Sequence, residues 1–209
     1  MASDANVPVI ISDLASNLKD QTPFVSIDKK SESSANYNFN KGKEELQNNN
    51  SQIALEYFVK AKDLDALRFR APSKINSIIK SLADKYSFNF VSAEKRFNEI
   101  SPNGIVGDNL MTDHLHPTIT GYQEIGELFI NKMLNENLLP NSKKVLSTSD
   151  QQNNFVRSHY NFTHLDSTIG RYRLTILKSD WPFVNNPQTL EEVIKNFNVQ
   201  NFSDSLALF

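Results

Sequence analysis

The sequence contains no cysteine, and this absence removes several kinds of site. Disulfide bonds, thiol catalysis and metal sites with cysteine ligands are all excluded. No apolar run reaches the roughly 18 residues that a membrane-spanning helix needs. The net charge is only −2 at pH 7, so the chain lacks the basic excess that nucleic-acid-binding proteins carry. The first residues also do not form the basic and apolar regions of a signal peptide.

The residues that are present favour a folded α/β chain. Hydrophobic residues make up 39% of the 209, enough to build a core for one sizeable domain with a small appendage. The apolar, β-branched run from Val7 to Ile11 predicts a strand buried on both faces of a parallel sheet. Parallel strands need neighbours and crossover helices. We therefore expect the chain to be the second part of a longer domain.

Residues 37–66 predict a helical hairpin, with the run Asn48-Asn49-Asn50 as its turn. Gly42, Ala54, Phe58 and Ala61 match the small, small, aromatic and small positions of one tetratricopeptide unit. An ordinary helical hairpin inserted into the domain is the alternative.

Two further helices flank a short predicted strand. Apolar residues at a spacing of 3.6 predict a helix that begins at Pro72-Ser73, and residues 88–93 predict a strand after it. Helix followed by strand is typical of a crossover unit in an α/β layer fold. A second amphipathic helix is expected from about residue 120 to 134, with Thr120 and Gln123 as its capping box.

Residues 141–209 are interpreted as a mostly helical accessory segment beside a main domain of residues 1–140. Thr189 and Glu192 have the spacing of a capping box at the start of a helix. The segment Asp180-Trp181-Pro182-Phe183 is expected to interrupt the helices, with Trp181 as a packing anchor.

The segment Asp113-His114-Leu115-His116-Pro117 carries the strongest chemical signal. An aspartate three residues before a histidine on a loop can fold back so that its carboxylate reaches Nδ1 of the ring. Nε2 is then free to accept a proton from a hydroxyl nucleophile, as in the acid and base half of a catalytic triad. Asp113 is the candidate acid and His116 the candidate base.

Two other interpretations of this segment stay open. In the first, Asp113 stabilises the N-terminus of the following helix and His116 only packs. In the second, Asp113, His114 and His116 bind a metal ion together with His159 or His164.

The stretch from Asp113 to Tyr122, between a long loop and an amphipathic helix, resembles the last sequence block of the SGNH or GDSL hydrolase family. The rest is similar to a bacterial branch of that family with tetratricopeptide-like helices. The resemblance covers roughly residues 7–135, with supporting segments at 10–24, 65–72 and 101–105.

The resemblance implies a partial three-layer α/β/α sheet with a helical hairpin insertion and a helical C-terminal segment. It also implies hydrolysis of an ester on a small molecule or glycan through an acyl-serine intermediate, with no cofactor, in the cell envelope or periplasm. Asp113 and His116 match the family's acid and base. The serine nucleophile and the oxyanion glycine and asparagine have no match, and Ser203-Asp204-Ser205-Leu206 near the end is interpreted as chance. The chain alone is therefore expected to be inactive.

Three residues are candidates for substrate contact. Asn17 follows the first predicted strand, where it lines a cleft or stabilises a turn. Arg68 and Arg70 bind an anionic substrate or partner, or form ion pairs with Asp63 or Asp65. The alternative function is a tetratricopeptide-like module on a hydrolase-derived scaffold that binds a protein partner through its helices.

Overall fold

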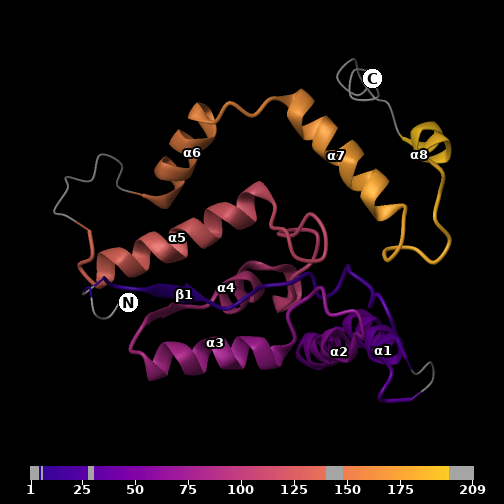
Figure 1. Cartoon of the computed structure of the whole chain (residues 1–209), viewed down its shortest axis with the longest axis horizontal. Helices are drawn as coiled ribbons and strands as arrows, with labels where there is room; N and C mark the ends of the chain where they lie inside the picture. The colour runs from indigo at the N-terminus through magenta and orange to yellow at the C-terminus, as the bar shows by residue number, and fades with distance from the viewer. Residues whose placement is uncertain (1–4, 6, 28–30, 140–147, 198–209) are drawn as a thin grey trace. The chain divides into compact units, whose positions relative to one another are not determined.

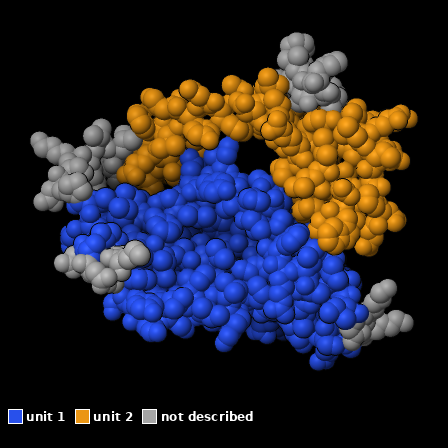
Figure 2. Space-filling model, in the orientation of Figure 1, with its two compact units in different colours: residues 1–145 blue, residues 146–209 orange. Residues whose placement is uncertain are grey.

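The computed structural model describes residues 5, 7–27, 31–139 and 148–197. Within these residues the chain forms eight α-helices and one two-stranded parallel sheet. It divides into two compact units, residues 1–145 and residues 146–209, which Figure 2 shows in different colours. The expected boundary after residue 140 falls among residues 140–147, which lie outside the described residues.

The sheet of the first unit joins strands that are far apart in the sequence. β1 (Ile10–Ser12) pairs in parallel with β2 (Asn89–Val91), with Ile11 opposite Phe90. The long connection between them contains helices, among them α3 (Ser73–Lys85), which contacts both strands. α5 (Ile119–Asn135) contacts β2, and Figure 1 shows β1 between α3 and α5. The general α/β expectation is thereby confirmed.

A short helix, α4 (Ala93–Ile100), begins where the sequence pattern suggested that the strand continues. The Ser92 hydroxyl accepts a hydrogen bond from the Lys95 N–H at 3.1 Å, which caps the helix. Asp13, just after β1, accepts hydrogen bonds from the Ser92 hydroxyl and, at 2.9 Å, from the Glu94 N–H. These side-chain bonds end β2 at Val91, so the predicted strand 88–93 is too long. A 3₁₀ turn, η1 (Pro102–Gly104), follows.

The predicted helical hairpin is confirmed as α1 (Ala35–Gln47) and α2 (Ser51–Leu64). The Asn-rich run forms the turn, where Asn49 has a φ of 62°, a conformation that asparagine tolerates better than most residues. Ser34 caps α1 by accepting a hydrogen bond from the Tyr37 N–H at 3.2 Å.

Close helix packing holds this hairpin together. The Phe39 and Phe58 rings meet edge to face with centroids 5.4 Å apart. A Cβ atom at Gly42 would lie only 2.9 Å from the Phe58 ring, so a small residue is required there. The buried cluster around this contact consists of Leu18, Phe39, Ala54, Phe58, Ala61 and Ile105.

The start of α5 differs from the expected one. Its N-cap is Thr118, whose hydroxyl accepts a hydrogen bond from the Gly121 N–H at 3.2 Å, rather than Thr120. Gly121 lies tightly against the preceding loop, because a Cβ there would be 2.6 Å from the Leu110 carbonyl oxygen. The first turn of α5 is therefore fixed against the segment that precedes it.

The second unit consists of α6 (Ser149–His159), α7 (His164–Lys178) and α8 (Leu190–Asn196). All three begin with a capping box, and the predicted box of Thr189 and Glu192 is one of them. The Phe197 ring packs edge to face with Tyr172, with centroids 5.1 Å apart. Trp181 is 61% exposed, so its predicted role as a packing anchor is wrong within the described residues.

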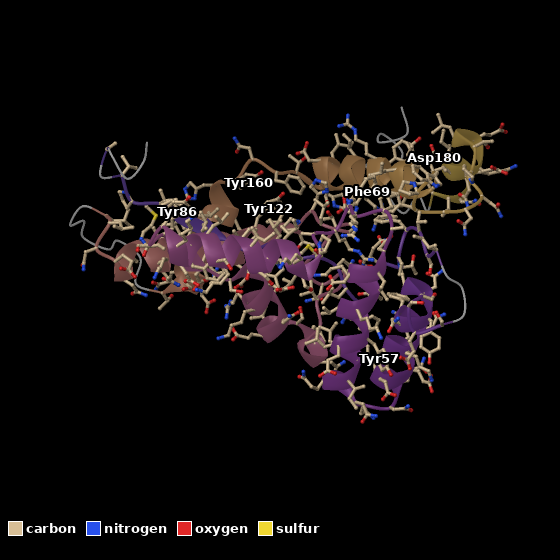
Figure 3. The ribbon with its side chains drawn as sticks, turned by 60° about the horizontal axis from the view of Figure 1, so that its bottom comes forward. Tyr57, Phe69, Tyr86, Tyr122, Tyr160 and Asp180 are labelled. Atoms are coloured by element: carbon tan, nitrogen blue, oxygen red, sulfur yellow. The ribbon has the colours of Figure 1, made fainter. Side chains whose placement is uncertain are left out.

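Within the part of the chain that the structure describes, no helix combines the length and the apolar character that crossing a bilayer demands. Figure 3 shows the side chains of the described residues, among them Tyr57 in α2 and Tyr122 in α5.

Substitution of Gly42 tests the packing of the hairpin. Gly42→Ala is expected to destabilise the protein by about 1–3 kcal/mol, because the new methyl group overlaps the Phe58 ring. Gly126→Ala in α5 is the matched control, since a Cβ there would have no atom within 4 Å and alanine favours helix by up to about 1 kcal/mol. Urea denaturation measures both changes, and equal effects at the two glycines would contradict the packing.

Candidate acid–base site

The segment between Met111 and Pro117 forms a small closed loop. These two residues form an antiparallel β-bridge. Thr112 donates hydrogen bonds to the His116 carbonyl oxygen from its backbone N–H at 2.8 Å and from its hydroxyl at 2.9 Å. The loop is thus tied at its base just before α5 begins.

Asp113 and His116 are in direct contact inside this loop. Asp113 Oδ2 lies 2.7 Å from His116 Nδ1. Asp113 Oδ1 accepts hydrogen bonds from the backbone N–H groups of Leu115 and His116, both at 2.8 Å. Asp113 is only 2% exposed, whereas the His116 side chain is 61% exposed. A buried carboxylate therefore orients an accessible imidazole.

The environment of Asp113 favours its charged form. Burial alone would raise the pKa of Asp113, but the N–H groups of His116 and Leu115 and the His116 ring together hold this pKa below its usual value. A carboxylate only accepts hydrogen bonds, so Nδ1 of His116 is the donor. In the neutral ring Nε2 is then the acceptor, which is the arrangement a general base needs.

Asn17 holds the loop in place. Its backbone N–H donates to the His114 carbonyl oxygen at 3.1 Å. Its side-chain amide donates to Asp108 Oδ1 at 2.7 Å and to the Asp113 carbonyl oxygen at 3.3 Å. Asn17 is buried, and these hydrogen bonds position the loop, while its predicted contact with substrate stays a prediction.

Arg70, the second residue predicted to contact substrate, forms hydrogen bonds and an ion pair inside the fold. Its guanidinium donates to the carbonyl oxygens of Asn17 at 2.9 Å and Gln21 at 3.0 Å. It also forms an ion pair with Asp65 at 3.3 Å, in which both side chains are buried. Burial lowers the pKa of Arg70, and the Asp65 carboxylate opposes this effect. The structure therefore contains the ion pair of Arg70 with Asp65, which was one of the alternatives from the sequence.

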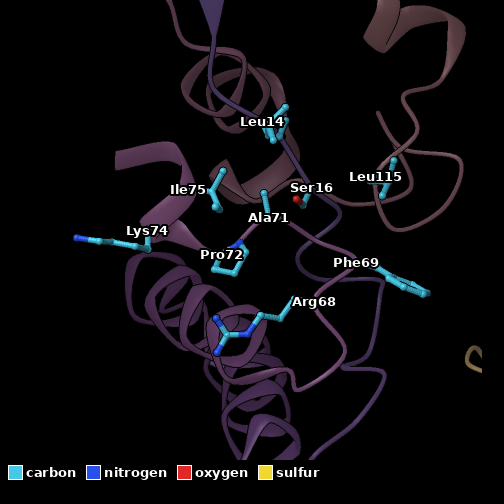
Figure 4. A pocket seen from close by; sticks show the side chains of 10 residues that line it. Leu14, Ser16, Arg68, Phe69, Ala71, Pro72, Lys74, Ile75 and Leu115 are labelled. Atoms are coloured by element: carbon cyan, nitrogen blue, oxygen red, sulfur yellow. The ribbon is translucent and has the colours of Figure 1, made fainter. Parts of the chain in front are cut away.

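Arg68, two residues earlier, is exposed and borders a pocket of about 510 Å³. Figure 4 shows the residues that line this pocket, among them Ser16 and Leu115. Leu115 immediately precedes His116, so the pocket adjoins the loop that carries the acid–base pair.

His114, whose only role predicted from the sequence was in the metal interpretation, is part of an aromatic cluster. Its ring centroid lies 5.2 Å from that of Phe24 and 5.7 Å from that of Phe69. The three residues come from distant parts of the chain, so no local sequence pattern predicts the cluster. His114 is buried, and its ring lies edge-on to His116 at 6.2 Å.

The geometry does not favour the two other interpretations of this segment. Thr118 caps α5, and the carboxylate of Asp113 forms its hydrogen bonds within its own loop rather than with the N-terminus of the helix. His116 is exposed rather than packed. Among the described residues, no three histidine, aspartate or glutamate side chains gather closely enough to hold a metal ion.

Ser203-Asp204-Ser205-Leu206, the segment interpreted as a chance match, lies outside the described residues.

Comparison with known proteins finds no matching protein family, no matching curated protein and no matching solved structure. The function is therefore inferred from the geometry of the site.

The two arginines provide a matched pair for a stability test. Arg70→Gln is expected to cost about 3–5 kcal/mol in unfolding free energy, because it leaves the buried Asp65 carboxylate without its ionic partner. Arg68→Gln is expected to stay within about 0.5 kcal/mol, because this side chain is exposed. Urea denaturation of both variants checks the contrast, and similar losses would contradict it.

The lowered pKa of Asp113 predicts how stability depends on pH. A carboxylate with a folded-state pKa below its unfolded value of about 3.9 stabilises the fold above that pH, and this contribution is lost as the pH falls through the folded pKa. Asp113→Asn should therefore be less stable than the wild type at pH 7, and the gap should narrow below about pH 4.

The measurement is urea denaturation of both proteins at several pH values. Asp84→Asn, at an exposed carboxylate on α3, is the control and should show little difference from the wild type at any pH. A gap for Asp113→Asn that stays constant down to about pH 3, below the unfolded-state value, would show that the charge of this residue contributes nothing.

Proposed function

We propose that this chain supplies the acid and base of a serine ester hydrolase of the SGNH or GDSL kind. The observation that carries the proposal is the 2.7 Å contact between the buried Asp113 carboxylate and the exposed His116 ring. Its support includes the parallel pair β1 and β2 with α3 and α5 packed on it, which fits part of a three-layer α/β/α domain.

In the proposed reaction, Nε2 of His116 removes the proton from a serine hydroxyl as the serine oxygen attacks the ester carbonyl carbon. The tetrahedral intermediate collapses, and the imidazolium returns the proton to the leaving alkoxide oxygen. Water, deprotonated by the same ring, then attacks the acyl-serine carbonyl carbon, and the ring returns the proton to the serine oxygen as the carboxylic acid leaves. Asp113 keeps the ring oriented throughout and stabilises its positive charge.

The serine nucleophile and the oxyanion donors come, in this proposal, from residues outside the 209 of this chain. The substrate is an ester of a short acyl group on a small molecule or glycan, as the resemblance implies. The alternative, a tetratricopeptide-like module that binds a protein partner, has the α1–α2 hairpin as its support. This alternative gives no role to the exposed ring of His116 or to the buried carboxylate of Asp113.

The test uses the natural gene product that carries this sequence with any flanking residues it has. It should react with a fluorophosphonate probe and hydrolyse p-nitrophenyl acetate. His116→Ala should abolish labelling and lower kcat/KM on the order of 10³–10⁴-fold, and Asp113→Asn should have a similar effect on kcat/KM. The 209-residue chain alone should not be labelled.

The control is His159→Ala, which changes an exposed histidine in α6 that stacks on Phe155. It should leave labelling and kcat/KM as in the wild type. A gene product that is unlabelled and inert toward acetyl and aryl esters would refute the hydrolase proposal, as would full activity of His116→Ala.

A further inference from the structure

The pocket beside the acid–base loop is bordered mainly by apolar side chains. Figure 4 shows Leu14 and Arg68 at opposite ends of the group, with Ile75 on one side and Leu115 on the other. Its volume of about 510 Å³ lies within the range of roughly 300–1,000 Å³ that small-molecule sites have. All of the lining residues belong to the first unit.

Several large apolar side chains around this pocket remain in contact with solvent. Leu14 is 48% exposed, Phe69 46% and Ile75 42%. Single exposed apolar residues are ordinary, but three around one hollow form the kind of patch that marks a binding site. Their exposed apolar surface favours an apolar ligand, because such a ligand would shield this surface from water.

The charged residues of the lining are both cationic. They are Arg68 and Lys74, and no aspartate or glutamate is among the described residues that line the pocket. Nearby carboxylates already have other partners, because Asp65 is paired with Arg70 and Asp63 accepts the Ser73 N–H at 2.8 Å. Within the described residues, neither Arg68 nor Lys74 forms an ion pair with a carboxylate. An anionic group at this border would meet uncompensated positive charge.

We propose that this pocket binds a single-chain amphiphile, an alkyl chain that ends in a carboxylate or phosphate. The alkyl chain contacts Leu14, Ile75 and Leu115, and the anionic group lies at Arg68. The proposal concerns binding and stands apart from the function proposed above, because such a ligand contains no carboxylic ester. The link to that site is Leu115, whose N–H donates to Asp113 Oδ1 at 2.8 Å.

Isothermal titration of the 209-residue chain tests the proposal with octyl phosphate, hexyl phosphate, octanoate, octyl glucoside and inorganic phosphate, each below its aggregation concentration. Octyl phosphate should bind about fivefold to fifteenfold more tightly than hexyl phosphate, because two more methylene groups are buried. It should also bind more tightly than the neutral octyl glucoside, and inorganic phosphate should not saturate. The relative affinities of octyl phosphate and octanoate identify the preferred anion.

Arg68→Gln should weaken octyl phosphate binding about threefold to fivefold, more at low salt, and leave octyl glucoside unchanged. Ile75→Asn should weaken both octyl compounds, because it removes apolar lining. Lys95→Gln is the control, since Lys95 is an exposed cation on α4 outside the pocket, and it should bind like the wild type. Unfolding curves confirm that each variant is folded.

Equal affinity for the hexyl and octyl compounds, equal affinity for the charged and neutral octyl compounds, or indifference to both pocket variants would overturn the proposal. The readout is binding by this chain and requires no serine. Its failure would leave the fluorophosphonate test of His116 unaffected, and failure of that test would leave the binding result standing.

Discussion

The buried ion pair between Arg70 and Asp65 is the interaction on which the arrangement of the first unit depends. A guanidinium and a carboxylate lose several kcal/mol each on leaving water, unless hydrogen bonds and opposite charge compensate them. Asp65 accepts hydrogen bonds from the N–H groups of Phe24 and Val25, at 2.8 and 3.0 Å. Arg70 donates to carbonyl oxygens of the segment after β1. The chain must therefore bring that segment and the α2–α3 connection together.

The same network reaches the acid–base loop through Asn17. The carbonyl oxygen of Asn17 accepts from Arg70, while its N–H and side-chain amide donate to the carbonyl oxygens of His114 and Asp113. A residue in the α2–α3 connection thus helps to set the position of a loop much later in the chain. Two nearby arginines have opposite roles, because Arg70 is buried in the scaffold and Arg68 is exposed at the pocket.

Local patterns in the sequence were sufficient for the features that involve nearby residues. The helical hairpin follows from the spacing of its small and aromatic residues, and α3 and α5 follow from periodicity. The contact of Asp113 with His116 follows from a spacing of three residues on a loop. The ion pair of Arg70 with Asp65, five residues away, was one of the alternatives from the sequence. The backbone partners of Asn17 and Arg70 could not be predicted, because they lie up to 96 residues away. α4 was missed because the side chain of Asp13, which follows another strand, helps to fix its start. The exposure of Trp181 likewise depends on tertiary packing, which a Trp-Pro pair does not encode.

The closed loop between Met111 and Pro117 has a consequence for how the geometry of the acid–base pair is determined. Among the described residues, the hydrogen bonds to the Asp113 carboxylate come from Leu115 and His116, so the pair is assembled within one short run of the chain. The internal geometry of the pair is therefore encoded separately from the scaffold that orients it. The distance between the carboxylate and the imidazole is set within the loop, whereas the position of the loop is set by residues far away in the sequence, among them Asn17.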